Sequence, residues 1–312
     1  MRHLDAEEVR RRLAMPALVE ALRQGFRADI EAPPRHHHPM KVPGGRDAIL
    51  LLMPAWQSGK HFGVKLASVF PDNGARGLPA VQALYLLGSG TTGEPLALLE
   101  GKMLTVRRTA AASALAADYL ARPDAESLLM VGTGALAPHL IEAHASQRRL
   151  RRVLVWGRDP AKAEALAAGH RHLAPAVEAV ADLEAAVGRA DIISCATLSP
   201  EPLVRGAWMR PGQHLDLVGA FTPEMRESDD EAIRRAEVYV DTLEGAPREG
   251  GDIARPLAEG LLTLEEIRGD LFGLCRGSAP ARGDPEAITL FKSVGHALED
   301  LVAAELAYGR PE

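Results

Sequence analysis

Apolar positions near the start of the chain are spaced as on one face of a helix. Val9, Leu13, Leu22 and Phe26 recur at helical intervals, and Asp5 stands just before the first of them. This pattern predicts an amphipathic helix over the first 26 residues, with Asp5 as its N-cap.

The pattern then changes from helical spacing to short apolar runs. Residues 31–45 are broken by proline and glycine and are expected to form a loop. Four apolar runs follow one another with no long helix between them, which predicts an antiparallel or mixed sheet with a hairpin connection between the last two. The four runs are residues 48–54, 61–70, 80–87 and 95–100.

From residue 103 onward, helical stretches alternate with apolar runs. An Ala-rich helix ends at Pro123, and strands and helices then take turns along the chain. Such alternation predicts a parallel sheet with helices on both faces. The predicted strands are residues 127–132, 152–157, 176–181, 191–197, 214–220 and 238–242, and the helices between them are residues 138–147, 160–170 and 183–190.

These patterns predict an α/β protein of two domains, as a length of 312 residues also favours. Residues 121–290 are expected to form a Rossmann-type, doubly wound parallel sheet. Residues 1–120 are expected to form a smaller α+β domain, to which the final helical stretch in residues 291–312 is assigned.

Composition narrows the classes of function. Hydrophobic residues make up 46% and charged residues 25%, as in ordinary globular proteins. A net charge of -6 gives no electrostatic reason to expect a nucleic-acid or anionic membrane partner, and no apolar run is long enough to span a membrane. With only Cys195 and Cys275, neither a disulfide framework nor a zinc cysteine cluster is expected. We expect a cytoplasmic protein that acts on a small solute.

A glycine-rich turn follows the first strand of the predicted parallel sheet. Gly132, Gly134 and Ala137 form the pattern G-x-G-x-x-A between that strand and a helix. In dinucleotide-binding proteins the first glycine allows a tight turn, the second lets the pyrophosphate approach the backbone, and the small third residue lets helix and strand pack closely. The alternative is a glycine-rich turn of another α/β fold.

Arg158 stands where the second strand of such a domain reads the adenosine ribose. NAD-selective proteins carry Asp or Glu there, whereas a guanidinium can pair with a 2′-phosphate. The sequence therefore favours NADP(H), with NAD(H) possible because Asp159 is the next residue. A solvated surface arginine is the alternative. An NADP(H) site would favour a reduction, because cells generally keep this cofactor reduced.

Two basic residues lie in otherwise apolar surroundings. Lys65 is either half-exposed at a sheet edge or desolvated, in which case its lowered pKa makes it a usable proton donor. Arg107 and Arg108 are consecutive on a helix, so one can be solvated while the other faces inward. An inward arginine is costly without a carboxylate partner, and a substrate carboxylate would fill that role.

At these residues the chain resembles the ornithine cyclodeaminase/mu-crystallin family, which includes ketimine and pyrroline-2-carboxylate reductases and an archaeal-type alanine dehydrogenase. The resemblance covers nearly the whole chain. It includes the segments GVKLASVFPDN, LTVRRTAAASALAADYL, VGTGALA and FKSVGHALEDL. The most specific feature is the combination of the lysine in G-V-K with the R-T-A-A sequence that follows it on the helix.

The resemblance implies a homodimer, with the first domain forming the interface and binding substrate, and an active site between the domains. It implies that Lys65 is the catalytic lysine and that Arg108 binds a substrate carboxylate, with Arg35 as a second arm and Met53 beside the substrate. Thr109, Ser293 and Gly295 are implied on the cofactor side.

One position departs from the family pattern. Ornithine cyclodeaminases carry an aspartate where this chain has Phe221, and a phenyl ring can neither accept a proton nor hold an ammonium group. Glu224 or Asp216 are the possible substitutes. The leading hypothesis is therefore NAD(P)H-dependent reduction of a ketimine of the pyrroline-2-carboxylate type. Ornithine cyclodeamination to proline and ammonia, and ligand binding without turnover as in mu-crystallin-like members, are the alternatives.

Other residues suggest chemistry but are not assigned a role in it. His36, His37 and His38 are consecutive in a predicted loop and lack a Cys or H-E-x-x-H partner, so no metal site is expected. Cys195 is expected to pack beside the cofactor rather than act as a nucleophile.

Overall fold

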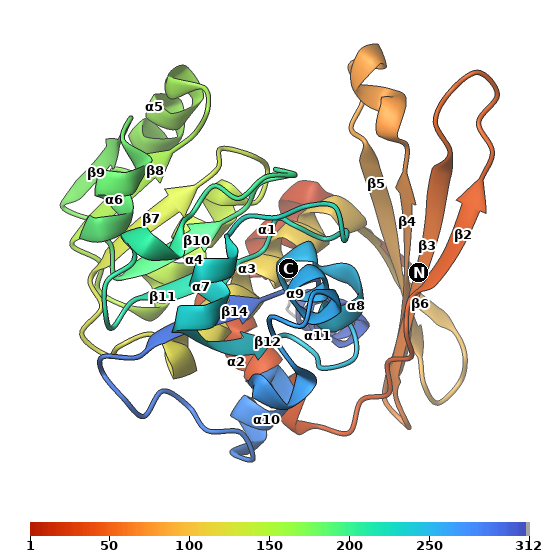
Figure 1. Cartoon of the computed structure of the whole chain (residues 1–312). Helices are drawn as coiled ribbons and strands as arrows, with labels where there is room; N and C mark the ends of the chain where they lie inside the picture. The colour runs from red at the N-terminus through yellow and green to blue at the C-terminus, as the bar shows by residue number, and fades with distance from the viewer. Residues whose placement is uncertain (310–312) are drawn as a thin grey trace. The chain divides into compact units, whose positions relative to one another are not determined.

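A computed structural model describes residues 1–309 (Figure 1). The chain divides into two compact units, Met1–Arg108 together with the segment from His296, and Thr109–Gly295. The first unit ends inside helix α3 (Gly101–Leu120), whereas the sequence pattern placed the boundary at the end of that helix.

The first unit contains a six-stranded mixed sheet, as the apolar runs predicted. Its strand order is β1-β6-β5-β4-β3-β2, antiparallel except for the parallel pair of β1 and β6. The predicted loop at residues 31–45 was wrong in part, because it contains β2, an exposed edge strand where Pro39 is tolerated. The strands are β1 (Arg2–Leu4), β2 (His36–Met40), β3 (Ala48–Gln57), β4 (His61–Val69), β5 (Val81–Ser89) and β6 (Pro95–Glu100).

Helices α1 (Ala6–Arg12) and α2 (Met15–Arg27) replace the single N-terminal helix that the spacing predicted. Asp5 caps α1, as predicted, and Glu8 completes a capping box with it. The chain breaks before Pro16, which lacks the N–H needed inside a helix but suits the first turn of a new one.

The remaining helices of this unit are α11 and a short 3₁₀ helix. Helix α11 (Ala297–Gly309) packs against α2 and against strands β3, β4 and β5 of the sheet. The 3₁₀ helix η1 (Pro71–Arg76) connects β4 to β5. Since α11 lies on one face of the sheet, every second residue of these strands points toward the helix and is buried beneath it.

The second unit contains an eight-stranded sheet of the predicted parallel, doubly wound type. Its order is β13-β12-β14-β11-β10-β7-β8-β9, and every pairing is parallel. Strands β13 and β14 were missed by the sequence pattern. The strands are β7 (Ser127–Val131), β8 (Arg152–Trp156), β9 (Ala176–Ala179), β10 (Ile192–Cys195), β11 (His214–Leu217), β12 (Ala236–Val240), β13 (Ile267–Asp270) and β14 (Ile288–Lys292).

The central strands of this sheet are fully buried, as expected for a parallel sheet covered on both faces. No helix within residues 1–309 is long and apolar enough to cross a membrane. The helices of this unit are α4 (Ala137–Gln147), α5 (Pro160–Gly169), α6 (Leu183–Arg189), α7 (Asp230–Arg235), α8 (Ala246–Glu249), α9 (Gly251–Ala258) and α10 (Leu271–Arg276), with 3₁₀ helices η2 (Gly206–Trp208) and η3 (Leu264–Glu266).

Candidate active site

Lys65 lies at the centre of the covered face of the first unit's sheet. On β4 it pairs with Met53 of β3 on one side and with Tyr85 of β5 on the other. Because directly opposite residues point to the same face, all three side chains lie on the side that α11 covers. All three are buried, which confirms desolvation over the edge alternative for Lys65.

Helix α11 supplies two carboxylates that bind the basic residues. The Nζ of Lys65 lies 2.7 Å from Oδ2 of Asp300. Arg108 donates from Nε to Oδ1 of the same Asp300 at 3.0 Å, and from Nη1 to Oε2 of Glu299 at 2.7 Å. Asp300 therefore bridges the two cations inside the first unit.

These contacts correct two expectations about the arginine pair. Arg107 and Arg108 are both buried, so neither is solvated. Arg107 donates to the carbonyl oxygen of Leu13 instead of to water. Arg108 does not need a substrate carboxylate to offset its burial, since Glu299 and Asp300 already do so. Its inward orientation is confirmed, but the reason lies in helix α11.

Burial changes the protonation of this cluster. Desolvation lowers the pKa of Lys65 to about 8, with the positive charges of Arg108 and Arg35 adding to the effect, while Asp300 opposes it. Burial raises the pKa of Asp300, but Lys65 and Arg108 outweigh it, so the net shift is downward. The result is a lysine that can exchange its proton near neutral pH beside a carboxylate that stays ionised.

Arg35 is partly buried immediately before strand β2. Its positive charge adds a small part to the lowering of the pKa of Lys65. A substrate carboxylate in reach of both would meet positive charge from two sides.

The glycine turn of the second unit has the geometry that a dinucleotide loop requires. Gly132 has φ of +116°, and a Cβ there would lie 2.7 Å from the carbonyl oxygen of Ala196, so only glycine fits. At Gly134 a Cβ would meet nothing of the chain closer than 4.0 Å. The chain's own packing does not require glycine at 134, as expected where a ligand approaches the backbone. Ala137 is buried as the first residue of α4.

Arg158 is exposed in the turn after β8, next to the glycine loop. The two segments touch, since Gly132 donates its N–H to Trp156 at 2.9 Å and a Cβ on Gly157 would meet the side chain of Thr133. Asp159 caps α5 by accepting from the backbone of Ala161 and Lys162. The carboxylate that could select NAD(H) is therefore engaged, and the guanidinium of Arg158 has no partner within residues 1–309.

Ser293 and Gly295 lie in a loop that Asp241 holds at the end of β14. Its carboxylate accepts from Ser293 Oγ at 3.2 Å and from the backbone N–H groups of Val294 and Gly295 at 2.7 and 2.6 Å. The sequence pattern gave Asp241 no role, although an acid directly after a buried strand was a signal for it. Thr109 is buried on α3, directly after Arg108.

The two candidates for replacing the family aspartate differ in their surroundings. Asp216 is fully buried and accepts hydrogen bonds from Ser113 and Ser194. Glu224 is exposed, and Phe221 is 40% exposed in the loop after β11. Burial raises the pKa of the Cys195 thiol well above its ordinary value, as expected for a packing residue and not for a nucleophile.

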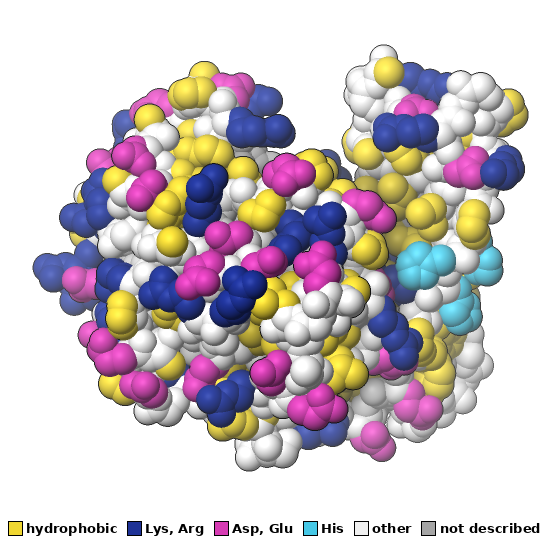
Figure 2. Space-filling view, in the orientation of Figure 1, with side chains coloured by type: hydrophobic (Ala, Val, Ile, Leu, Met, Phe, Trp, Pro, Cys, Tyr) yellow, Lys and Arg dark blue, Asp and Glu magenta, His cyan; other side chains and the backbone are white. Residues whose placement is uncertain are grey.

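The three consecutive histidines lie on the exposed strand β2. Side chains alternate along a strand, so His37 points to the opposite face from His36 and His38. Figure 2 shows histidine side chains gathered on the surface of this unit. Within residues 1–309 no three His, Cys, Asp or Glu side chains form a group that could hold a metal ion.

A family model described as "Ornithine cyclodeaminase/mu-crystallin family" matches residues 3–312. The chain belongs to this family. Delta(1)-pyrroline-2-carboxylate reductase of Paracoccus denitrificans is 40% identical to it over 294 residues, which cover 94% of this chain and 92% of the relative.

Two solved structures are similar over almost the full length. The Thermococcus litoralis Delta(1)-pyrroline-2-carboxylate reductase, in complex with NADH and L-proline, has a TM-score of 0.92 at 33% identity, covering 99% of this chain and 96% of that one. An archaeal alanine dehydrogenase dimer with bound NAD has a TM-score of 0.90 at 28% identity, covering 99% and 95%. This family member is thus an NAD(P)-dependent enzyme of the ketimine reductase or ornithine cyclodeaminase type.

Proposed function

We propose that the enzyme reduces pyrroline-2-carboxylate, or a closely similar cyclic ketimine, to the corresponding amino acid with NADPH. The observation that carries this proposal is the buried cluster of Lys65, Asp300 and Arg108, which combines a titratable proton donor with cations suited to a carboxylate. The cofactor would supply hydride to the imine carbon, while the protein supplies the proton to nitrogen.

Lys65 is proposed as the proton donor. With a pKa of about 8 it is mostly protonated at neutral pH and gives up its proton readily as negative charge develops on the imine nitrogen. Asp300 holds the ammonium group at 2.7 Å and stabilises its charged form between turnovers. Lys65 and Asp300 therefore act as a donor and the group that orients it.

Arg108 and Arg35 are proposed to bind the substrate carboxylate. The Nε and Nη1 atoms of Arg108 are held by α11, and Nη2 has no hydrogen bond or ion pair within residues 1–309. A guanidinium anchored at two nitrogens keeps a fixed orientation, so the third can bind a carboxylate with little loss of entropy. The proposed place of Met53, directly opposite Lys65, is beside the substrate.

The cofactor proposal rests on Gly132, Gly134 and Ala137 for the pyrophosphate and on Arg158 for the 2′-phosphate. NADP(H) is favoured over NAD(H) because Arg158 is exposed without a partner while Asp159 caps a helix. Thr109, Ser293 and Gly295 are proposed on the nicotinamide side. Gly295 and the neighbouring backbone are held in place by Asp241.

We propose a homodimer formed through the outer face of the first unit's sheet. On that face Leu66 of β4 lies directly opposite Leu52 of β3 and Leu84 of β5. Leu66 and Leu84 are 44% and 45% exposed. A contiguous apolar face of this kind typically marks an interface between proteins, and the similar alanine dehydrogenase is a dimer.

The test is a pair of assays on the purified protein. With pyrroline-2-carboxylate, one NADPH should be oxidised for each substrate molecule reduced. The loss of nicotinamide absorbance measures this oxidation. L-Ornithine with NAD should release no ammonia, because Phe221 replaces the aspartate of cyclodeaminases. Ammonia and proline from ornithine, with no net change in cofactor, would instead establish a cyclodeaminase.

A further inference from the structure

Glu227 carries a buried carboxylate that the proposed reaction does not use. It lies in the segment between β11 and α7 and is fully buried. Its Oε1 accepts from the backbone N and the Oγ1 of Thr197 at 2.6 and 2.9 Å, and its Oε2 accepts from the backbone N of Gly219 and Ala220 at 2.6 and 3.2 Å. A single side chain therefore ties together two separate loops.

Both loops lie at the carboxyl edge of the parallel sheet. Thr197 follows β10, and Gly219 with Ala220 follows β11. The chain order in the sheet reverses between β7 and β10, since β8 and β9 lie on the other side of β7. In open α/β sheets ligands bind outside the carboxyl ends of the strands at such a reversal. The loop that begins at Thr197 is therefore at the expected dinucleotide position.

The glycine loop touches the same segment. A Cβ on Gly132 would approach both the carbonyl oxygen of Ala196 and the methyl group of Thr197. A Cβ on Gly219 would overlap the backbone of Thr197, so the loops after β10 and β11 are in close contact. A displacement of Thr197 would therefore change the packing of both the glycine loop after β7 and the loop after β11.

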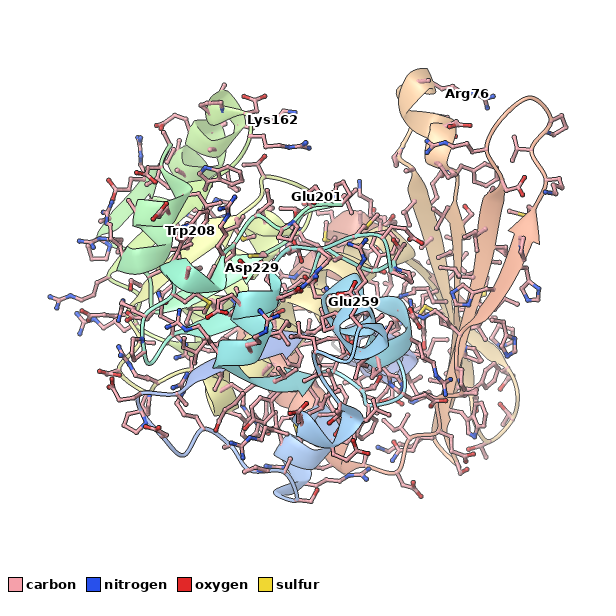
Figure 3. The ribbon with its side chains drawn as sticks, viewed as in Figure 1. Arg76, Lys162, Glu201, Trp208, Asp229 and Glu259 are labelled. Carbon is pink, nitrogen blue, oxygen red and sulfur yellow. The ribbon has the colours of Figure 1, made fainter. Side chains whose placement is uncertain are left out.

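Glu227 is itself held by a second buried carboxylate. Asp252 on α9 accepts from the backbone N of Glu227 and Ser228 at 2.8 and 3.1 Å, and its other oxygen lies 3.1 Å from Nζ of Lys292. Lys292 immediately precedes Ser293, in the loop already assigned to the cofactor. In Figure 3 the labelled Asp229, the N-cap of α7, marks where this segment enters its helix.

We propose that Glu227 is a positioning residue for the nicotinamide half of the cofactor, because its carboxylate fixes the loops after β10 and β11. A buried carboxylate is expensive and persists only when its oxygens are well bonded, as the four donors here ensure. An apolar side chain would fill the same space without holding either loop. The inference rests on the cofactor site of the proposed function and goes beyond it by naming what keeps that site in shape.

The closing experiment separates the two halves of the cofactor. Dissociation constants for NADPH and for adenosine 2′,5′-bisphosphate, which lacks the nicotinamide, are measured by calorimetry on the wild type and Glu227→Gln. We expect NADPH to bind about tenfold more weakly to the variant, equivalent to roughly 1.4 kcal/mol. The bisphosphate should bind as it does to the wild type, because the glycine loop and Arg158 are untouched.

Asp191→Asn is the matched control. Asp191 is also a buried, multiply bonded carboxylate of the second unit, but it lies before β10, at the amino edge of the sheet, where it accepts from Ser127 and from the backbone of Glu126. The control should lower the melting temperature and leave the ratio of the two dissociation constants unchanged. An unchanged ratio in Glu227→Gln, or equal weakening of both ligands, would overturn the inference.

Two further arms keep the test decisive. Thr197→Val removes only the hydrogen bond from Oγ1 to Glu227 and should shift the ratio of the two dissociation constants in the same direction. This variant provides the test if Glu227→Gln does not fold. If the wild type binds NADH in place of NADPH, the ratio is taken with NADH and ADP, so failure of the NADP(H) proposal leaves this test intact. A wild type that binds no dinucleotide would overturn both proposals.

A pH series gives an independent readout. Burial raises the pKa of Glu227 to about 7, with the charge of Asp252 adding to the effect and Lys292 opposing it. The buried thiol of Cys195 and the carboxylate of Asp216 are further titratable groups near this cluster. Protonation converts one acceptor oxygen into a donor, so the wild type should lose more NADPH affinity than the variant as the pH drops through about 7. The variant, which cannot titrate there, should lack this additional loss. Protonation of the 2′-phosphate itself affects both proteins equally and cancels in this comparison.

Discussion

At the scale of single residues, the proposed chemistry depends on a lysine whose pKa is lowered by burial. Desolvation, with a smaller effect of the charges of Arg108 and Arg35, lowers the pKa of Lys65 to about 8, although the carboxylate of Asp300 opposes the shift. The same residue on an exposed strand would remain fully protonated at neutral pH and would be a poor proton donor.

Replacing Lys65 with Ala should lower kcat/KM for imine reduction by about 10²–10⁴-fold, the range that general acid catalysis contributes. The affinity for NADPH should be retained, because no residue of the glycine loop is changed. Lys60→Ala, in the exposed hairpin turn that leads into the same strand, is the control and should be fully active. Steady-state kinetics and cofactor binding provide the measurement, and an active Lys65→Ala enzyme would refute the assignment.

The pH dependence should have opposite signs in the two directions of the reaction. Reduction needs the protonated lysine, so kcat/KM for the imine should fall as the pH rises through about 8. Oxidation of L-proline needs the neutral lysine as a base and should rise over the same interval. Initial rates across a pH series measure both, and profiles that stay flat through this interval would contradict the role of Lys65.

Replacing Arg158 with Ala should weaken NADPH binding by about tenfold to a hundredfold, the loss expected for charge-assisted hydrogen bonds to a phosphate. NADH should bind almost unchanged, since it lacks the 2′-phosphate. Arg152→Ala removes an exposed arginine from the opposite end of β8 and is the control. Titration of each variant with both cofactors gives the answer, and equal effects on the two would show that Arg158 is a surface residue without that role.

At the scale of secondary-structure elements, the packing of α11 decides the site. This helix provides Glu299 and Asp300, and it lies against the strands that carry Lys65 and Tyr85. Its position depends in turn on α2, where Gly25 lets the two helices approach closely: a Cβ there would lie 2.5 Å from Cγ2 of Val302.

A bulky residue at Gly25 should therefore affect both stability and activity. Gly25→Ile should lower the free energy of unfolding by about 1–3 kcal/mol through overpacking, and lower kcat because α11 shifts away from the lysine. Gly169→Ala, at the end of α5 with no atom within 4 Å of its new Cβ, should be nearly neutral. Chemical denaturation and kinetics test this, and a Gly25→Ile protein with unchanged stability would show that the helix contact adapts.

Sequence patterns located most of these elements but not their partners. The periodicity found β3 to β6 and β7 to β12, because alternation and apolar runs are local properties of the chain. It missed β1, β13 and β14, and also β2, where polar histidines occupy an exposed edge. It therefore could not show that β14 lies between β11 and β12. Neighbours in a sheet are chosen by tertiary pairing, which leaves no periodic signal in either strand.

At the scale of the whole molecule, the outer face of the first unit's sheet predicts the oligomeric state. Leu66→Glu would place a charge in the middle of this apolar face and should convert the proposed dimer to a monomer. Leu264→Glu changes a leucine of the second unit that is 56% exposed and should leave the dimer intact. Light scattering after gel filtration measures the mass, and a wild type that elutes as a monomer would contradict the proposal.

The sequence by itself determined the family, the two kinds of sheet and the positions where a single residue type is required. Gly132 and Ala137 follow from a turn of a few residues whose geometry is set locally, and Lys65 and Arg108 are recognisable within short motifs. Only the tertiary structure decided that Arg108 binds Asp300, 192 residues away, and that Glu227 and Asp241 hold the loops after β10, β11 and β14. The physical reason is that a buried charge must be neutralised by whatever lies beside it in space, and local spacing along the chain does not record that neighbour.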